Sequence, residues 1–233
     1  MNREKHILVV EDEEAIRNGL IDVLVYHGYK TDSAATGPEG LRKAQTGLFD
    51  LVLLDIMLPG LDGYAVCNAI RATDRELAVI MLTAKTSDEE IIEGLKLGAD
   101  DYVGKPFSVQ QLVLRIEAVL RRTPAGQEDA RQLQLDGVSI DLENLSGDRG
   151  GESLVFTRRE VDILAYLAAN PARPVPREEL LAKVWGYARN LDIETRTVDI
   201  HIAKLRRKIE ADAATPVNLV TVRGAGYKLN TEH

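Results

Sequence analysis

The sequence contains a single cysteine, Cys67, among its 233 residues. One cysteine cannot form a disulfide within the chain, which excludes a disulfide-stapled fold and fits a reducing cytoplasm. The residues around Cys67 are apolar at helical spacing, so we expect this side chain to pack in a core.

Long apolar stretches are also missing. No run approaches the roughly 20 residues that span a bilayer, and the first five residues lack the layout of a signal peptide. We therefore expect no membrane association. The length, in contrast, exceeds that of one typical domain and suits two, each with its own core.

Positive charge is scarce overall, since the formal net charge is −8. Taken alone, this value argues against a nucleic-acid partner, but the distribution of charge matters more. Residues 1–122 carry most of the acidic excess, whereas residues 195–208 hold five basic residues and one acid. Such a local basic patch can bind phosphates while the rest of the chain stays acidic.

Five short apolar runs alternate with helical patterns in the first half of the chain. The predicted strands are His6–Val10, Lys30–Ala34, Leu51–Leu54, Ala78–Leu82 and Asp101–Val103. The alternation predicts an α/β fold with a doubly wound, five-stranded parallel sheet. Ligands of such sheets bind at the carboxyl ends of the strands.

Polar side chains follow four of these strands. They are Glu11 with Asp12, then Asp55, Thr83 and Lys105. A helix N-terminus favours acidic residues and could by itself explain Glu11 and Asp12, but not the groups at the three other strand ends. Clustered carboxylates repel each other unless a cation joins them, and hard oxygen ligands suit Mg2+.

This set of residues suits phosphoryl transfer. A carboxylate can attack phosphorus and form an aspartyl phosphate, while a metal ion and an ammonium group stabilise the phosphoryl oxygens. Asp55 is the best nucleophile candidate because it lies centrally, whereas Glu11 and Asp12 are better metal ligands.

Four segments resemble the motifs of receiver domains, in order and at matching spacing. They are Val9–Glu13, Leu53–Gly63, Met81–Ala84 and Gly98–Phe107. The resemblance implies that Asp55 is the phosphoacceptor and that Asp12 and Asp55 bind Mg2+ directly. It further implies that Glu11 binds the ion through water and that the Met57 carbonyl completes the ligands.

The same resemblance assigns roles to three further residues. Thr83 and Lys105 would contact the phosphoryl group, and Tyr102 would turn inward on activation. The Lys105–Pro106 peptide is expected to be cis, an isomer that proline tolerates.

Flavin-binding and hydrolytic alternatives fit less well. An FMN phosphate needs Gly, Ser or Thr after the first strand, where this chain is acidic. Phosphatases with an aspartate nucleophile need a second acid two residues later, where this chain has Met57. A long-lived phosphate is therefore favoured. Lys85, two residues after Thr83, is placed to influence self-dephosphorylation. The alternative, a solvated lysine in a loop, explains it equally well.

The resemblance extends to the OmpR/PhoB subfamily, in which phosphorylation reshapes a face that then forms a homodimer. The residues that match the charged pairs of this face are Asp100, Asp101, Arg115 and Arg122. Ile91 and Gln111 depart from the pattern, since the family usually has a basic residue and Glu there. Because an exposed ion pair contributes only about 0–1 kcal/mol, dimerisation can survive this loss.

The second half of the chain reads as an α+β domain. Residues 123–131 are polar and aperiodic, so we interpret them as a linker between domains of residues 1–122 and 132–233. The predicted strands lie around Val138–Leu142 and Ser153–Phe156, with a hairpin over Leu219–Leu229. The predicted helices are Arg158–Asn170, Arg177–Val184 and Asp192–Ala211.

The last of these helices has two distinct faces. Its core stripe, which falls within about 60° on a helical projection, consists of Val198, Ile202, Leu205 and Ile209. The opposite face holds Arg196, Ile200, Ala203 and Arg207. Cations that meet phosphates or guanine and apolar groups that meet thymine methyls suit the DNA major groove. The alternative is a basic surface helix with incidental apolar residues.

Three further segments resemble the winged-helix effector domain of OmpR/PhoB-type regulators. They are Leu154–Glu160, Arg196–Leu205 and Thr221–Tyr227. The resemblance implies DNA contacts by Arg196, Lys204 and Arg206 from the recognition helix, and by Arg223 from a Gly-rich wing that suits the minor groove. It also implies that residues 185–191 contact RNA polymerase, although plain packing explains Trp185 equally well. Ala203 departs from a frequent Arg.

Together these patterns predict a phosphorylation-dependent, DNA-binding transcriptional regulator of a two-component system. Asp55 is expected to accept a phosphoryl group from a sensor histidine kinase, after which paired receivers bind tandem DNA half-sites. Beyond self-phosphorylation and self-dephosphorylation, no enzymatic activity is expected. The alternative is a phosphorylation-independent DNA-binding regulator whose receiver serves only for dimerisation.

Overall fold

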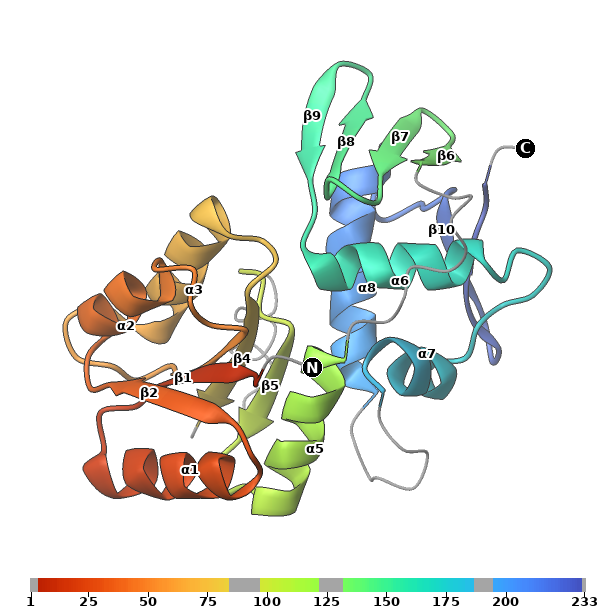
Figure 1. Ribbon diagram of the computed structural model, residues 1–233. Coiled ribbons are helices and arrows are strands. Elements are labelled where there is room, and N and C mark those ends of the chain that lie inside the picture. The colour runs from red at the N-terminus through yellow and green to blue at the C-terminus, as the bar shows by residue number, and fades with distance from the viewer. Residues whose placement is uncertain (1–3, 84–96, 122–131, 187–194, 232–233) are drawn as a thin grey trace. The chain divides into compact units, whose positions relative to one another are not determined.

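Figure 1 shows the computed structural model, which describes residues 4–83, 97–121, 132–186 and 195–231. The chain forms two compact units, residues 1–120 and 121–233, and each is described by itself. The predicted linker, residues 123–131, lies outside the described residues. None of the described helices is long and apolar enough to cross a membrane.

The N-terminal unit contains a five-stranded parallel sheet in the order β2-β1-β3-β4-β5. From β1 to β5 the strands are His6–Val10, Lys30–Ala34, Leu51–Asp55, Ala78–Thr83 and Asp101–Gly104. The predicted sheet is thus confirmed, and β3, β4 and β5 each extend one residue further. β1 and β3 are buried along their whole length, as expected for strands that are covered on both faces.

Helices cover both faces of this sheet. Helices α1 (Glu14–Tyr26) and α5 (Val109–Leu120) lie on one face, and α2 (Gly37–Ala44) and α3 (Gly63–Thr73) lie on the other (Figure 1). This arrangement confirms the predicted doubly wound fold.

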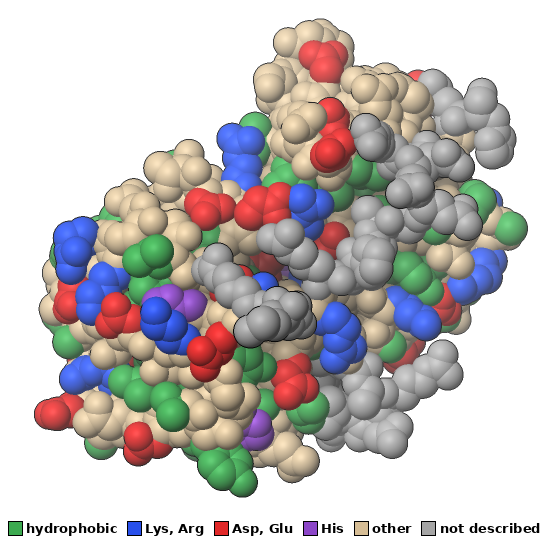
Figure 2. All heavy atoms as spheres, viewed as in Figure 1, with side chains coloured by type: hydrophobic (Ala, Val, Ile, Leu, Met, Phe, Trp, Pro, Cys, Tyr) green, Lys and Arg blue, Asp and Glu red, His purple; other side chains and the backbone are tan. Residues whose placement is uncertain are grey.

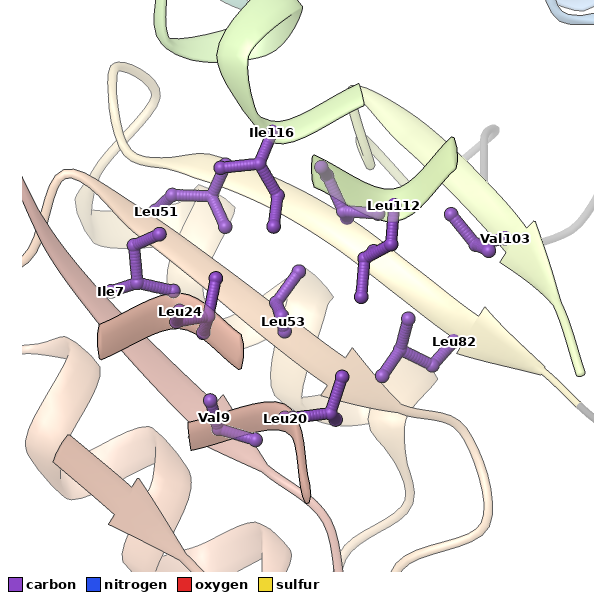
Figure 3. Packing of buried hydrophobic residues seen from close by; sticks show 11 residues of the cluster. Ile7, Val9, Leu20, Leu24, Leu51, Leu53, Leu82, Val103, Leu112 and Ile116 are labelled. Atoms are coloured by element: carbon purple, nitrogen blue, oxygen red, sulfur yellow. The ribbon is translucent and has the colours of Figure 1, made fainter. Parts of the chain in front are cut away.

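The core on the α1 and α5 side is built from alternate residues of the strands. In Figure 3, Leu53 and Leu82 of the sheet lie near Leu20, Leu24 and Leu112 of the two helices. Every buried member of this cluster is at most 5% exposed. Burying a side chain of this size contributes about 1.5–3 kcal/mol, so this core fixes where the strand ends lie.

Helix α3 begins directly against the backbone of the strand end that carries Asp55. A Cβ atom on Gly63 would lie 2.2 Å from the Asp55 carbonyl oxygen, so only glycine fits there. The Gly63 amide donates to the Ile56 carbonyl at 2.9 Å, and the Asp62 side chain caps α3 by accepting from the Ala65 amide at 2.8 Å. The loop beside Asp55 is thereby fixed.

The C-terminal unit begins with a four-stranded antiparallel meander in the order β6-β7-β8-β9. The strands are Gln132–Leu135, Val138–Asp141, Ser146–Arg149 and Glu152–Val155. The sequence predicted β7 and β9 but missed β6 and β8. Strand β8 has the sequence Ser-Gly-Asp-Arg, which offers no apolar alternation, so its pairing with β7 and β9 makes it a strand.

Three helices and a hairpin complete this unit. They are α6 (Arg158–Ala168), α7 (Arg177–Val184), α8 (Arg196–Ile209), β10 (Leu219–Val222) and β11 (Gly226–Leu229). All were predicted, with α7 at the predicted bounds and α6 two residues shorter. The predicted core stripe of α8 is confirmed, since each of its four side chains is at most 1% exposed.

Helix α8 ends at Ile209, two residues before the predicted end. The next residue, Glu210, is extended, and its carboxylate accepts from the backbone amides of residues 217–219 at 2.7–3.2 Å. These hydrogen bonds tie the end of α8 to the start of β10. Residues 192–194, where the sequence predicted the first turn, lie outside the described residues.

Replacing Gly63 with alanine is expected to lower the free energy of unfolding of the N-terminal unit by about 1–3 kcal/mol, the range for an extra methyl group in a packed site. Urea denaturation followed by circular dichroism measures this change. The control is Gly19→Ala in α1, where a Cβ would meet no atom within 4 Å and a gain of about 0.5–1 kcal/mol is expected. Equal effects of the two substitutions would contradict the close approach at Gly63.

Candidate functional site

Three carboxylates meet at the carboxyl edge of the N-terminal sheet. Glu11 and Asp12 follow β1, Asp55 ends β3, and these two strands are neighbours. One oxygen of each carboxylate lies within 4.8 Å of the others. Glu11 and Asp55 are buried, whereas Asp12 is exposed. The structure therefore places these three predicted residues side by side.

Lys105 supplies a positive charge to this edge. Its Nζ lies 2.7 Å from Glu11 Oε2 and 2.9 Å from Asp55 Oδ2. The Lys105–Pro106 peptide is cis, as the resemblance implied. The Lys105 amide donates to the carbonyl of buried Thr83 at 2.6 Å, so the ends of β4 and β5 also meet here. An ammonium between two buried carboxylates offsets part of their repulsion.

The ionisation of this cluster reflects both burial and pairing. Burial raises the pKa of Glu11 and outweighs the hydrogen bond from Lys105, while the charge of Asp55 raises it further. Burial would lower the pKa of Lys105, but hydrogen bonds to Glu11 and Asp55 outweigh it, so this pKa is raised. Lys105 therefore stays charged at neutral pH, and Glu11 holds its proton to a higher pH than an exposed glutamate does.

Two contacts fix the loops that carry the acids. Arg17 of α1 donates from Nη1 to the carbonyl oxygens of Glu11 at 2.8 Å and Asp12 at 3.0 Å. The Met57 amide donates to Asp55 Oδ1 at 3.3 Å, while the Met57 side chain is exposed. Sequence reasoning missed Arg17, because an arginine on an amphipathic helix gives no sign of a contact with a preceding loop.

The donor set fits a hard divalent cation. Its members are carboxylate oxygens, which Mg2+ prefers, and the exposed Asp12 leaves room for the waters that this ion keeps. Glu11, Asp12 and Asp55 offer the ligand atoms. A cation there would offset the repulsion that Lys105 offsets only in part.

The acids of the predicted dimer face are paired inside the N-terminal unit. Asp101 accepts from Arg115 Nη1 at 2.7 Å. Asp100 accepts from Arg71 Nη2 at 2.9 Å and from the Val79 amide at 2.8 Å. Both acids are buried, so in this state neither carboxylate is presented to a second chain.

Arg122 of the predicted dimer face lies outside the described residues, as does Ile91. Gln111, the other position that departs from the family pattern, is exposed, and the predicted switch residue Tyr102 is half-buried. Arg71 was not predicted, because its partner is set by how α3 packs against the start of β5 and not by its own neighbours.

The exposed face of α8 is narrower than the sequence predicted. Ala203 and Arg207 are exposed, but Ile200 is only 7% exposed. The predicted exposure of Ile200 is wrong because the first turns of α8 are buried on several sides, as the buried Thr197 and His201 show.

Two of the predicted DNA-contact side chains form contacts within the C-terminal unit. Lys204 Nζ lies 3.1 Å from Glu160 Oε1. Arg206 donates to the Leu219 carbonyl at 2.8 Å and to Thr221 Oγ1 at 2.7 Å. The side chains of Lys204 and Arg206 therefore also join α8 to other elements.

The other predicted basic DNA-contact residues lie on α8 and on the hairpin. Arg207 is exposed on α8, and Arg223 is exposed at the hairpin tip. Arg196 begins α8, but its side chain lies outside the described residues.

Glu160 of α6 is a buried anion that faces α8. It forms a capping box with Thr157 at the start of α6 and lies 2.6 Å from the Nζ of Lys208 in addition to its contact with Lys204. Burial would raise the pKa of Glu160, but the charges of the two lysines and the hydrogen bonds lower it. The Thr-x-x-Glu spacing could have indicated the capping box, but not the lysines.

Two family models match the chain. The model described as response regulator receiver domain matches residues 7–117, and the one described as transcriptional regulatory protein, C terminal, matches residues 151–229. The sensory transduction protein RegX3 of Mycobacterium tuberculosis is 42% identical over 227 residues, which cover 96% of this chain and 98% of the relative. The DNA-binding response regulator MtrA of the same organism is 41% identical over 224 residues, with 96% of each chain covered.

Solved structures give the same result. A variant of RitR is 29% identical with a TM-score of 0.74, and the Thermotoga maritima response regulator DrrB, an OmpR/PhoB homolog, is 31% identical with a TM-score of 0.52. Both comparisons cover 97% of this chain and 99% of the other.

A receiver domain followed by a winged-helix DNA-binding domain defines a two-component response regulator. The chain belongs to the OmpR/PhoB family of these regulators. The family role is phosphorylation-dependent control of transcription, which implies a cognate histidine kinase and DNA as partners and a regulator rather than a classical enzyme.

Replacing Glu11 with glutamine is expected to raise the Tm at neutral pH without divalent cations. The folded-state pKa of Glu11 is raised, so the stability linked to this group is present at low pH and is lost as the pH rises through that pKa. Calorimetry over a pH series should show the advantage of the variant shrinking as the pH falls.

The control for this experiment is Glu39→Gln. Hydrogen bonds from Lys43 and from the Ala35 amide lower the pKa of Glu39. The ionised Glu39 therefore stabilises the folded state at neutral pH, and Glu39→Gln should lower the Tm there. A lower Tm for both variants would show that burial does not dominate at Glu11.

Proposed function

We propose that phosphorylation of Asp55 switches this regulator in the cytoplasm. The observation that carries the proposal is the placement of the Asp55 carboxylate beside Glu11 and Asp12, with Lys105 Nζ 2.9 Å away. An Asp55 oxygen attacks the phosphorus of a phosphohistidine on the kinase. The O–P bond forms as the N–P bond breaks, and the released imidazole nitrogen takes up a proton.

Mg2+ would be held by Glu11, Asp12 and Asp55, with Glu11 acting through water and the Met57 carbonyl as a further ligand. When bound, the ion neutralises charge on the phosphoryl oxygens. Thr83 and Lys105 would contact the same oxygens. Besides accepting the phosphoryl group of the kinase, the site would catalyse only self-phosphorylation from small donors and slow self-dephosphorylation.

Dimerisation would follow from an exchange of ion pairs. Asp101 pairs with Arg115 and Asp100 with Arg71 within one chain. In the proposed dimer, Asp100, Asp101, Arg115 and Arg122 would pair between chains, and Tyr102 would turn inward. The aspartyl phosphate would shift the population toward the dimer-forming conformation, because its contacts stabilise that conformation more than the unphosphorylated one.

The proposed DNA surface consists of Arg196, Lys204, Arg206 and Arg207 on α8 and Arg223 on the wing. The exposed Arg207 and Arg223 support it most directly. Two paired receivers would place two such surfaces on tandem half-sites. Trp185 is fully buried against Arg159 and His201, so packing explains this residue and it is not available to a partner. Residues 186–191 would contact RNA polymerase; of these, 187–191 lie outside the described residues.

The switch is tested by analytical ultracentrifugation with Mg2+ and beryllofluoride, a phosphoryl analogue. Wild type is expected to shift from monomer to dimer and Asp55→Ala to stay monomeric, because only wild type can hold the analogue. Asp22→Ala, which removes an exposed carboxylate of α1, should dimerise like wild type. Dimers in every sample, with or without the analogue, would favour the phosphorylation-independent alternative.

DNA contact by α8 is tested with Arg207→Ala. We expect weaker binding to all duplex sequences. The negative slope of log affinity against log salt concentration should become shallower by about 1, because one phosphate contact is lost. Fluorescence anisotropy at several salt concentrations measures both. Arg42→Ala, which removes an exposed cation from α2, should leave the slope unchanged. An unchanged slope for Arg207→Ala would remove this residue from the DNA surface.

A further inference from the structure

Three side chains from three elements form one polar cluster next to the proposed DNA surface. Asp199 of α8 accepts through Oδ1 from Arg177 Nε of α7 at 2.6 Å and from the Tyr227 hydroxyl of β11 at 2.5 Å. Arg177 Nη2 donates to the same hydroxyl at 2.9 Å. The Arg177 guanidinium also stacks on the Tyr227 ring, 4.8 Å from its centroid.

Tyr227 is anchored by its backbone as well as its hydroxyl. It exchanges two backbone hydrogen bonds with Val175, at 2.7 and 2.9 Å. Gly226 passes so close that a Cβ there would lie 2.0 Å from the Val175 carbonyl oxygen. The hairpin is therefore held firmly at this point, four residues after its exposed Arg223.

The hydroxyl of Tyr227 both donates to Asp199 and accepts from Arg177. Burial and the hydrogen bond to Asp199 raise the pKa of Tyr227 to about 12. The Arg206 guanidinium lies 5.8 Å from the centroid of the Tyr227 ring. Arg206 also donates to the Leu219 carbonyl of β10. Two arginines and one carboxylate thus hold the hairpin against α7 and α8.

An acid on a DNA-contacting helix repels phosphates, so Asp199 has an electrostatic cost that its pairing must outweigh. We propose that Asp199 is a positioning residue for DNA binding: together with Arg177 and Tyr227, it holds the wing so that Arg223 reaches DNA at the same time as the exposed face of α8. This inference rests on the proposed DNA contacts, and its test separates the two.

The same unit contains a matched control. Glu179 of α7 accepts through Oε1 from Arg173 at 2.6 Å and from the Tyr166 hydroxyl at 2.7 Å. This second cluster has the same chemistry, but its three members belong to α6, to the segment before α7 and to α7 itself. Glu179→Gln therefore removes the same charge and the same kinds of hydrogen bond as Asp199→Asn, without touching α8 or the hairpin.

The test is a double-mutant cycle on the full chain with Mg2+ and beryllofluoride. The probe is a labelled duplex DNA that wild type selects from a random-sequence pool, and fluorescence anisotropy gives the affinity. Asp199→Asn is expected to weaken binding by about tenfold, within the range for coupled residues of one network. In an Arg223→Ala background the same change should cost less than about twofold, because the contact that it positions is already gone.

The sign of the effect separates positioning from electrostatics. If Asp199 only repels DNA, its neutralisation tightens binding, and that result would overturn the proposal, as would an equal loss in both backgrounds. Glu179→Gln should leave the affinity within about twofold of wild type. Tyr227→Phe removes only a hydroxyl and should reproduce the coupling to Arg223 if Asp199→Asn fails to fold. If Arg223→Ala binds DNA as tightly as wild type, the proposed wing contact itself is wrong, and the positioning role falls with it.

Discussion

The contact of the Lys105 ammonium with Glu11 and Asp55 is the interaction on which the N-terminal unit depends. Parallel strands bring their carboxyl ends to one edge, and in this chain that edge carries two buried acids. Buried carboxylates without compensation cost several kcal/mol, because burial removes the water that stabilises their charge. Lys105 offsets this cost only in part, since the pKa of Glu11 remains raised. The edge is therefore suited to bind further positive charge, which is what a Mg2+ and phosphoryl site requires.

The same physical device recurs where other elements join. Asp100, directly before β5, pairs with Arg71 of α3. Glu160 with Lys204 and Lys208 ties α6 to α8, and Asp199 with Arg177 ties α8 to α7. In each case the acid and the base come from different segments, so the ion pair fixes an orientation as well as offsetting a charge. The pairs of Asp100 and Glu160 are buried, whereas that of Asp199 is partly exposed. Breaking a buried pair by removing one partner leaves an uncompensated charge and is strongly destabilising. A regulator that exchanges such pairs on phosphorylation would therefore move between discrete arrangements.

The sequence predicted the elements well because their signal is local. Apolar runs of period 2 and 3.6 report which face of an element is buried, and the strands and the core stripe of α8 followed from them. Strand β8 was missed because its four residues carry no such pattern. Ile200 was misplaced because a helical projection assumes one buried face, whereas the first turns of α8 are buried on several.

Partners between elements were harder to predict than the elements themselves. The partners of Arg17, Arg71 and Glu160 are distant in sequence or lie outside the helix that carries the residue. No local pattern identifies these partners. The cluster of Glu11, Asp12, Asp55 and Lys105 was predictable for the opposite reason. Each residue follows a predicted strand, and the topology of a parallel sheet alone brings strand ends together.

The commitment of cations to internal pairs bears on how DNA binding is controlled. Of the predicted DNA-contact side chains that the structure describes, Arg207 and Arg223 are exposed, while Lys204 and Arg206 also have partners inside the unit. Each phosphate contact contributes a salt-dependent term to affinity, so one copy of a chain with net charge −8 has few such terms available. In the proposed dimer, two copies held together by their receivers would double the contacts and make the second binding event intramolecular. A strongly basic domain would bind DNA without a partner. With only Arg207 and Arg223 exposed among the described basic DNA-contact side chains, the proposed switch would make binding depend on pairing, and hence on phosphorylation.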